Sequence, residues 1–291
     1  MGDLARPALF EDRPSFRLLR ADWAHADGPS LDFGPGQYFD LIDQNEALAH
    51  ELAVATRRKP GRLPFWGQLP MRQLLTDDPL LLGRRKVLPS VGTLTLRRTP
   101  DGQASFFLLL RGKGRVATGE GIFGPLPGGM IQPASVSPHA HRRDLSLWRV
   151  IMREYNEELL GAPEATGDSG TEVEYGQPPY SLLDAALDDG SLRVWCFGMA
   201  LEPLHLAVCV LTVAVFEAHT FDLVFAEAVE ENDEGRVISQ RADGAVVGLP
   251  FTEAGIADLP AARLSSPAAG LLQLALQHQE MLLAPPGCAP A

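Results

Sequence analysis

Three glutamates at helical spacing are the residues of this sequence best suited to carry out chemistry. Glu154, Glu157 and Glu158 occupy positions i, i+3 and i+4 of segment 148–161, WRVIMREYNEELLG. If the segment is a helix, all three carboxylates project from one side of it. Like charges at this spacing repel one another, and a divalent cation is the simplest partner that would compensate them. Mg2+ and Mn2+ prefer carboxylate oxygens and often bind a substrate phosphate as well.

The opposite side of the same segment is apolar. Four positions recur there at helical spacing: Trp148, Ile151 or Met152, Tyr155 and Leu159. This pattern predicts an amphipathic helix whose apolar side packs on a core and whose acidic side faces solvent. An acidic helix face is most often simply solvated, and Arg153 can neutralise part of this one. The turn Pro127-Gly128-Gly129 and the apolar strand before it favour the metal-binding interpretation instead.

Composition and charge exclude several classes of function. The 291 residues are 45% hydrophobic and 21% charged, which is typical of one large globular domain or two small ones. A net charge of -12 without a Lys/Arg-rich run argues against binding long nucleic acid.

Cysteine usage and hydropathy predict the compartment. Cys196, Cys209 and Cys288 are too widely spaced for a zinc site or a disulfide framework, so we expect a reducing, cytoplasmic environment. The sequence begins without a signal-peptide pattern, and the most apolar run, 206–216, is too short to span a bilayer. We therefore expect no association with membranes.

The first 85 residues read as an N-terminal extension. Prolines interrupt residues 1–35, which we expect to be an irregular strap packed on a core. Segment 38–56 has helical periodicity and ends at the basic, Pro-Gly-containing run 57–61. A short helix is expected at 71–75.

From position 86 the pattern changes to strands mixed with helices. Segments 90–97 and 105–110 predict a hairpin around the turn at 99–102. Segment 206–217 is apolar on both sides, as in a central strand. Further strands are expected at 121–127, 192–202, 236–239 and 245–251, and further helices at 182–187, 220–229, 252–259 and 267–283. We thus expect an α+β domain over 86–284 and a loose tail at 285–291.

Region 86–251 resembles the Nudix hydrolase family. The family signature is G-x5-E-x7-R-E-U-x-E-E-x-G-U, where U is a bulky aliphatic residue. Gly129 matches its first glycine, and segment 153–158, REYNEE, matches its R-E-U-x-E-E core with the aromatic Tyr155 at U. Ser135 stands where the first Glu belongs. The Arg-Glu pair begins at Arg153 rather than at position 143, so the loop is ten residues longer. Arg143-Asp144, at the nominal spacing, lacks the following Glu pair and reads as a decoy.

The resemblance implies an α+β fold, a Nudix-like α/β/α sandwich with a mixed β-sheet, plus the N-terminal extension. It implies Mg2+ or Mn2+ bound by Glu157 and Glu158, with Glu154 as a further ligand or as the base that activates water. Arg153 would orient a helix carboxylate, and the carbonyl of Gly128 or Gly129 would complete the metal shell. A later acid often contributes in this family; four remain open here: Glu230, Glu231, Asp233 and Glu234.

Basic residues near a strand end are candidates for substrate binding. Arg111, Lys113 and Arg115 lie in a glycine-rich loop and could hold a phosphate, and Glu231 is a further candidate for substrate binding. For each of them a solvated loop residue is an equally good interpretation. His139 and His141, in the longer loop, fit exposed positions better than metal ligands, and a lid over the substrate is an intermediate interpretation.

Two functions remain open from sequence. The first is a metal-dependent pyrophosphohydrolase acting on a phosphoanhydride, such as a nucleoside diphosphate linked to another group. The second is a catalytically impaired Nudix-like module that binds a nucleotide or metabolite as a sensor. Either would have a small phosphorylated partner, and the N-terminal strap could support a homodimer.

Overall fold

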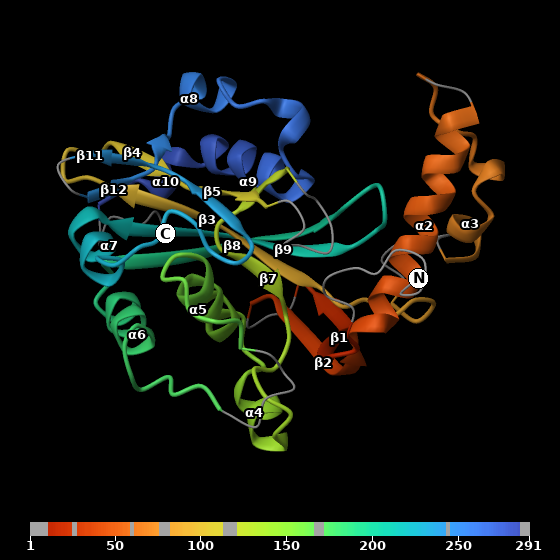
Figure 1. Cartoon of the computed structure of the whole chain (residues 1–291), viewed down its shortest axis with the longest axis horizontal. Coiled ribbons are helices and arrows are strands. Elements are labelled where there is room, and N and C mark those ends of the chain that lie inside the picture. Colours follow the sequence, from red (N-terminus) through yellow and green to blue (C-terminus); the bar gives the residue numbers. More distant parts are fainter. Residues whose placement is uncertain are drawn as a thin grey trace.

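The computed structural model describes residues 11–24, 28–58, 61–75, 82–112, 121–165, 172–242 and 245–285. Its central element is a six-stranded sheet with helices on both sides (Figure 1). The strand order is β13-β4-β3-β9-β8, and β7 also pairs with β3. The bounds are β3 Ser90–Arg98, β4 Ala104–Phe106, β7 Gly128–Met130, β8 Leu192–Leu201, β9 Val208–Glu217 and β13 Leu249–Pro250. Because β3 and β9 are parallel while the other pairs are antiparallel, the expected α+β fold with a mixed sheet is confirmed.

Alternating side chains of the central strands divide the core in two. Leu94 and Leu96 of β3 point into one cluster, which includes helix α9 (Ser266–Gln277). Val91 of β3 belongs to the other cluster, which includes helix α5 (Leu147–Glu158). Strand β9 contributes buried residues to both clusters, as the sequence predicts for a central strand.

The expected second strand of the hairpin is divided between two sheets. Strand β4 stays in the main sheet, whereas β5 (Leu108–Arg111) pairs with β10 (Gly235–Ile238) and β6 (Phe123–Pro125) in a three-stranded sheet. Strands β11 (Gln240–Ala242) and β12 (Ala245–Val247) form a separate ribbon. The remaining helices are α4 Pro138–Arg143, α6 Tyr180–Asp188, α7 Ala218–Val224, α8 Glu253–Ala257, η2 Ala261–Arg263 and α10 Gln279–Leu282.

The segment expected to be an irregular strap is a β-hairpin. Strands β1 (Pro14–Asp22) and β2 (Ser30–Gln37) pair antiparallel. Proline is tolerated here because Pro14 begins its strand and a two-stranded ribbon consists of edges alone. The expected packing on the core is confirmed, since Phe16 N donates to Ile131 O at 3.1 Å and Phe16 is buried.

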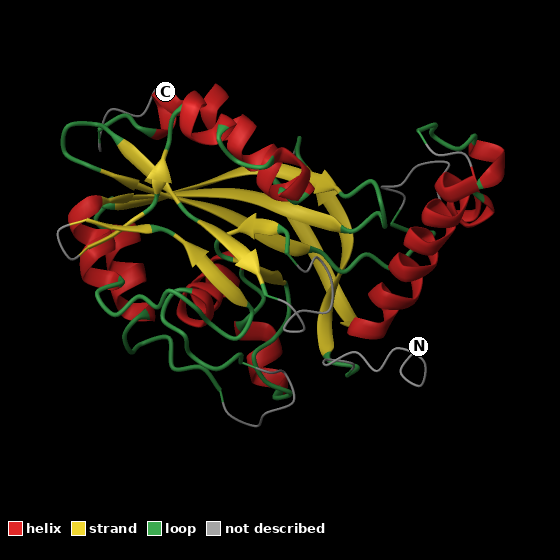
Figure 2. Cartoon of the chain, turned by 45° about the horizontal axis from the view of Figure 1, so that its top comes forward, coloured by secondary structure: helices red, strands yellow, loops and turns green. Residues whose placement is uncertain are grey.

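An arm of helices follows the hairpin and extends away from the sheet (Figures 1 and 2). It consists of α2 (Tyr38–Arg58), the short η1 (Trp66–Gln68) and α3 (Pro70–Leu75). The end of the arm exposes apolar side chains, among them Leu63, Phe65 and Trp66. Over the described ranges, the structure contains no helix with the length and apolar character needed to cross a membrane.

Candidate functional site

Helix α5 is specified by its cap and by its apolar stripe. Ser146 caps the helix by accepting a hydrogen bond from Arg149 N at 3.4 Å. The predicted stripe is buried, and the hydroxyl of Tyr155 hydrogen-bonds Thr95 Oγ1 at 2.7 Å inside the sheet. These contacts fix the rotation of the helix and therefore the direction in which its glutamates point.

The acidic side of α5 is covered rather than solvated, so the expectation of a solvent-facing side was wrong. Glu154 is 8% exposed and Glu158 is 2% exposed, while Glu157 is half-buried. Strand β7 covers Glu154 and Glu158: Gly128 N lies 3.4 Å from Glu158 Oε1. The carboxylate of Glu154 lies directly on Gly129, where any Cβ atom would overlap it. Glycine at position 129 is therefore required by this close approach.

The buried acids affect one another. Burial, and then the charges of Glu157 and Glu234, raise the pKa of Glu154 well above its ordinary value. Burial, and then Glu234 and Glu154, do the same to the pKa of Glu158. The pKa of Glu157 is raised to about 7, mainly by burial and partly by Glu164. Such a group of acids is costly unless protons or cations neutralise it.

One of the four later acids joins this group. Glu234 raises the pKa values of all three helix glutamates, and its own pKa is raised by burial. Glu231, our predicted substrate contact, is exposed beside β10, as are Glu230 and Asp233. The sequence left these four open because their order along a loop does not show which side chain turns inward.

Arg111 is one of the cations that act on the group. Its charge lowers the pKa values of Glu158 and Glu234 against the effect of burial. Its backbone pairs with Gly235, and its buried Nε has no hydrogen-bond partner among the described residues. Lys113 and Arg115, the other two predicted phosphate contacts, lie outside the described residues.

The donors fit a hard divalent cation, although they are not drawn together around one point. Within the described ranges, no three His, Cys, Asp or Glu side chains converge closely enough to hold an ion. Glu158 Oε2 is nevertheless buried and lacks a hydrogen-bond partner among the described residues. A buried carboxylate oxygen without a partner, in a group of like-charged carboxylates, is chemically suited to Mg2+ or Mn2+.

Arg153 makes its hydrogen bonds away from the helix glutamates. Its guanidinium donates to Gln132 O at 2.6 Å and to the Tyr175 hydroxyl at 3.0 Å, and it lies 3.4 Å from Asp144 Oδ2. Its charge still lowers the pKa values of Glu154 and Glu157.

Asp144, which spacing identified as part of a decoy, is the buried acid that pairs with Arg153. It is fully buried, accepts from Ala134 N at 2.9 Å and accepts from the Tyr175 hydroxyl at 3.0 Å. Ser135, at the position of the signature Glu, is itself buried. The longer loop therefore carries its own acid to Arg153, an arrangement that motif spacing alone could not show.

The two histidines of the longer loop take part in local contacts. His139 lies exposed beside Glu172, 3.2 Å away, and the ring of His141 packs edge-on against Phe16. The loop contains helix α4, and His141 is only partly exposed, so the expectation of an exposed, irregular loop was wrong in this part.

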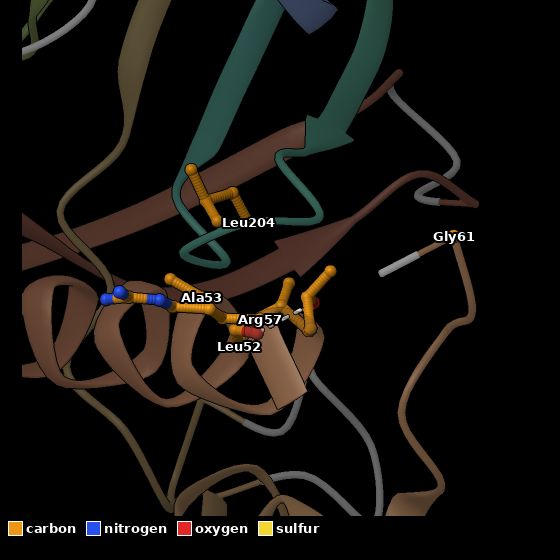
Figure 3. Close-up of a pocket in the computed structure, with 6 residues that line it drawn as sticks. Leu52, Ala53, Arg57, Gly61 and Leu204 are labelled. Carbon is orange, nitrogen blue, oxygen red and sulfur yellow. Dashed lines mark hydrogen bonds between the residues drawn. The ribbon is translucent and has the colours of Figure 1, made fainter. Parts of the chain in front are cut away.

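Two apolar hollows lie away from the acids. One, of about 530 Å3, lies between α2 and the turn after β8 and includes Leu52, Arg57 and Leu204 (Figure 3). The other, of about 650 Å3, runs along β8 and includes Trp195, Phe197 and Met281. Neither contains an acidic side chain, so the candidate chemistry stays with the glutamates.

Comparisons with known proteins give structural neighbours only. No family model and no curated protein matches the sequence. A MutT/Nudix family protein from Enterococcus faecalis aligns with TM-score 0.33 and 12% identity over 82% of this chain and 74% of its own. Nudix hydrolases from M. smegmatis and Alicyclobacillus acidocaldarius both align with TM-score 0.31, at 14% and 15% identity, over 68% and 69% of this chain and 90% and 93% of their own.

The chain resembles Nudix hydrolases in sequence motif and in fold. At TM-scores of 0.31 to 0.33 this likeness is partial.

Proposed function

We propose that the chain is a Mg2+- or Mn2+-dependent hydrolase that cleaves a phosphoanhydride bond in a small phosphorylated substrate. The observation that supports this most is the burial of Glu154 and Glu158 on one helix, with the Glu154 carboxylate seated on Gly129. A protein that needed only a stable helix would not bury several acids on it, because each uncompensated carboxylate lowers stability.

Glu154, Glu157 and Glu158 would hold the cation, together with the backbone carbonyl of Gly129. The cation would neutralise charge on the phosphate oxygens and make a bound water more acidic. Arg153 would restrain the helix from behind through Asp144 and Tyr175.

Glu154 is the candidate general base, because the resemblance gives this position as a ligand or as the base that takes a proton from the attacking water. The water oxygen would bond to one phosphorus of the diphosphate, and the bridging oxygen would leave with the other phosphate. Arg111, with Lys113 and Arg115 of the following loop, would hold the charged substrate, and Glu231 would contact its outer part.

Phosphate or nucleoside monophosphate release tests this proposal. Nucleotide sugars, dinucleotides and nucleoside triphosphates would each be incubated with the protein and Mg2+ or Mn2+. We expect turnover of at least one class and its loss in Glu157→Gln, whereas Glu227→Gln, which changes an exposed carboxylate, should behave as wild type. If Glu157→Gln leaves hydrolysis and metal binding unchanged, the assignment of Glu157 to the cation site is wrong.

A nucleotide- or metabolite-binding module is the second candidate. Its support is that the glutamates do not converge around one point in the described part of the chain, and that Ser135 replaces the signature acid. Calorimetric binding of a substrate analogue without any turnover of the same panel would favour this function.

We also propose that the protein is cytoplasmic and that it forms a homodimer. We propose further that its N-terminal extension ends near residue 85. Analytical ultracentrifugation would test the dimer. Limited proteolysis would test the boundary.

A further inference from the structure

A chain of contacts leads from the N-terminal hairpin to Glu157. It begins at Arg13, just before β1, whose guanidinium Nη1 lies 2.9 Å from Glu164 Oε2. The Arg13 side chain is only 15% exposed, and its backbone carbonyl accepts from Tyr38 N at 2.9 Å. A second acid, Glu11, lies 3.2 Å from the same guanidinium. Arg13 is therefore held at both its backbone and its side chain.

The next contact is made by the neighbour of Glu164 in sequence. Ala165 N donates a hydrogen bond of 2.9 Å to Glu157 Oε1. The segment that carries both residues folds back onto α5, because Ala162 N donates to Asn156 O at 3.0 Å. Gly161 makes this reversal with φ of 68°. Segment 161–165 is thus anchored to the helix at one end and to Arg13 at the other.

We infer that Arg13 is a positioning residue for the proposed cation site: by holding Glu164, it keeps Ala165 N–H aimed at the Glu157 carboxylate. This inference rests on the proposed function, in which Glu157 binds the cation. A hydrogen bond to a ligating carboxylate fixes the direction of its oxygens, and losing such support typically costs 10- to 100-fold in metal affinity or activity.

The direction in which cation affinity changes when Arg13 is removed distinguishes a positioning role from an effect of its charge. Arg13 is a cation paired with Glu164, and the charge of Glu164 acts on Glu154 and Glu157. If it acted only through its charge, removing it would strengthen cation binding, because the site would become more negative. If it positions Glu157, removing it weakens cation binding, because the carboxylate loses its fixed direction.

Mn2+ affinity, measured by titration calorimetry on the full chain, is the test. We expect Arg13→Ala to weaken Mn2+ binding about 10-fold, Arg13→Lys to recover much of it, and Glu164→Ala to match Arg13→Ala. The double variant should lose no more than either single variant, since both break one contact. Arg20→Ala is the matched control, because Arg20 forms an exposed ion pair with Asp22 in the same hairpin. Hydrogen exchange at the Ala165 amide should accelerate in Arg13→Ala and stay unchanged in Arg20→Ala.

The outcomes distinguish the two proposals. If the wild-type chain binds Mn2+ and Arg13→Ala binds it equally or more tightly, the positioning role of Arg13 is wrong while the hydrolase proposal stands. If the wild-type chain does not bind Mn2+, the cation site itself is wrong, and the role of Arg13 falls with it.

Discussion

Helices α5 and α9 lie on opposite sides of the same sheet and form a natural pair for comparison. Each has 12 residues, and each begins after a serine that caps it, Ser146 or Ser265. Helix α9 has the sequence SPAAGLLQLALQ and contains no charged residue. Helix α5 contains five: Arg149, Arg153, Glu154, Glu157 and Glu158.

The two helices serve different purposes: α9 contributes to the stability of the fold, whereas α5 carries the residues suited to chemistry. Helix α9 buries Ala268, Leu271, Leu272 and Ala275, which contribute apolar contacts and little else. Helix α5 buries a comparable apolar stripe but also places Glu154 and Glu158 out of water. Apolar burial is favourable in itself, whereas buried carboxylates are unfavourable until something neutralises them. We therefore expect variants of the two helices to change stability and activity in opposite ways.

The largest expected effect is on activity, in Glu158→Gln of α5. Hydrolysis should fall by more than about 100-fold, beyond what the loss of a group that merely supports a ligand costs. At pH 8 without metal, the free energy of unfolding should stay the same or rise, because a neutral amide replaces a buried acid. Activity assays and urea unfolding measure the two quantities. A variant that is inactive because it is unfolded would contradict the comparison.

Leu271→Ala in α9 should give the reverse result. Removing a fully buried leucine side chain should lower the free energy of unfolding by about 2–5 kcal/mol. The kcat of the variant should stay near the wild-type value at a temperature where circular dichroism shows it to be folded. A large fall in kcat under that condition would show that the α9 side also supports the site.

The pH dependence of stability in this range should come from the buried acids of α5 and from Glu234, with no contribution from α9. Glu157 has a pKa raised from 4.5 to about 7, so between these values the folded state binds more protons than the unfolded state. Without metal, stability should therefore fall as pH rises from about 4.5 to about 7, by the order of 1–3 kcal/mol. Glu157→Gln should flatten this decline, whereas Leu271→Ala should lower the whole curve without changing its slope. Urea unfolding at several pH values measures both, and a slope that survives in Glu157→Gln would assign it to other groups.

The smallest expected effects are at the two caps. Ser146→Ala and Ser265→Ala should each lower the free energy of unfolding by about 1 kcal/mol, because each removes the acceptor for a helix N–H group. Only Ser146→Ala should also lower activity, since it loosens the start of the helix that carries the glutamates. Equal activity in the two variants would mean that the first turn of α5 does not affect the site.

Periodicity predicted both helices of this comparison, because their apolar faces are local in sequence. It also predicted β3, β8 and β9, whose alternating or continuous apolar runs leave little choice. It failed at β1 and β2, where the pairing of Phe16 with Pro35 depends on tertiary contacts that override the proline signal.

The sequence predicted which residues form the candidate site, but it did not predict their burial or the residues around them. The spacing of Glu154, Glu157 and Glu158 was enough to propose a shared side of the helix. Their burial could not be predicted, because it depends on Gly129 and on loops distant in sequence. The roles of Asp144 and Glu164 were missed for the same reason, since each meets its arginine partner only in the folded chain.

The split between β4 and β5 makes the site a two-part structure. Glu154 and Glu158 belong to a helix that packs on the main sheet, whereas Arg111 belongs to the three-stranded sheet and Glu234 directly precedes its strand β10. Arg111 pairs with Gly235, and Gly112 N donates to Glu234 O at 2.8 Å, so backbone hydrogen bonds of this smaller sheet fix the spacing of the two oppositely charged residues. A shift of the three-stranded sheet relative to α5 would change the distances of Arg111 and Glu234 from the helix together. The spacing between Arg111 and Glu234 would stay the same. The width of the site thus depends on how the two sheets pack, whereas its local charge balance depends on the pairing of β5 with β10.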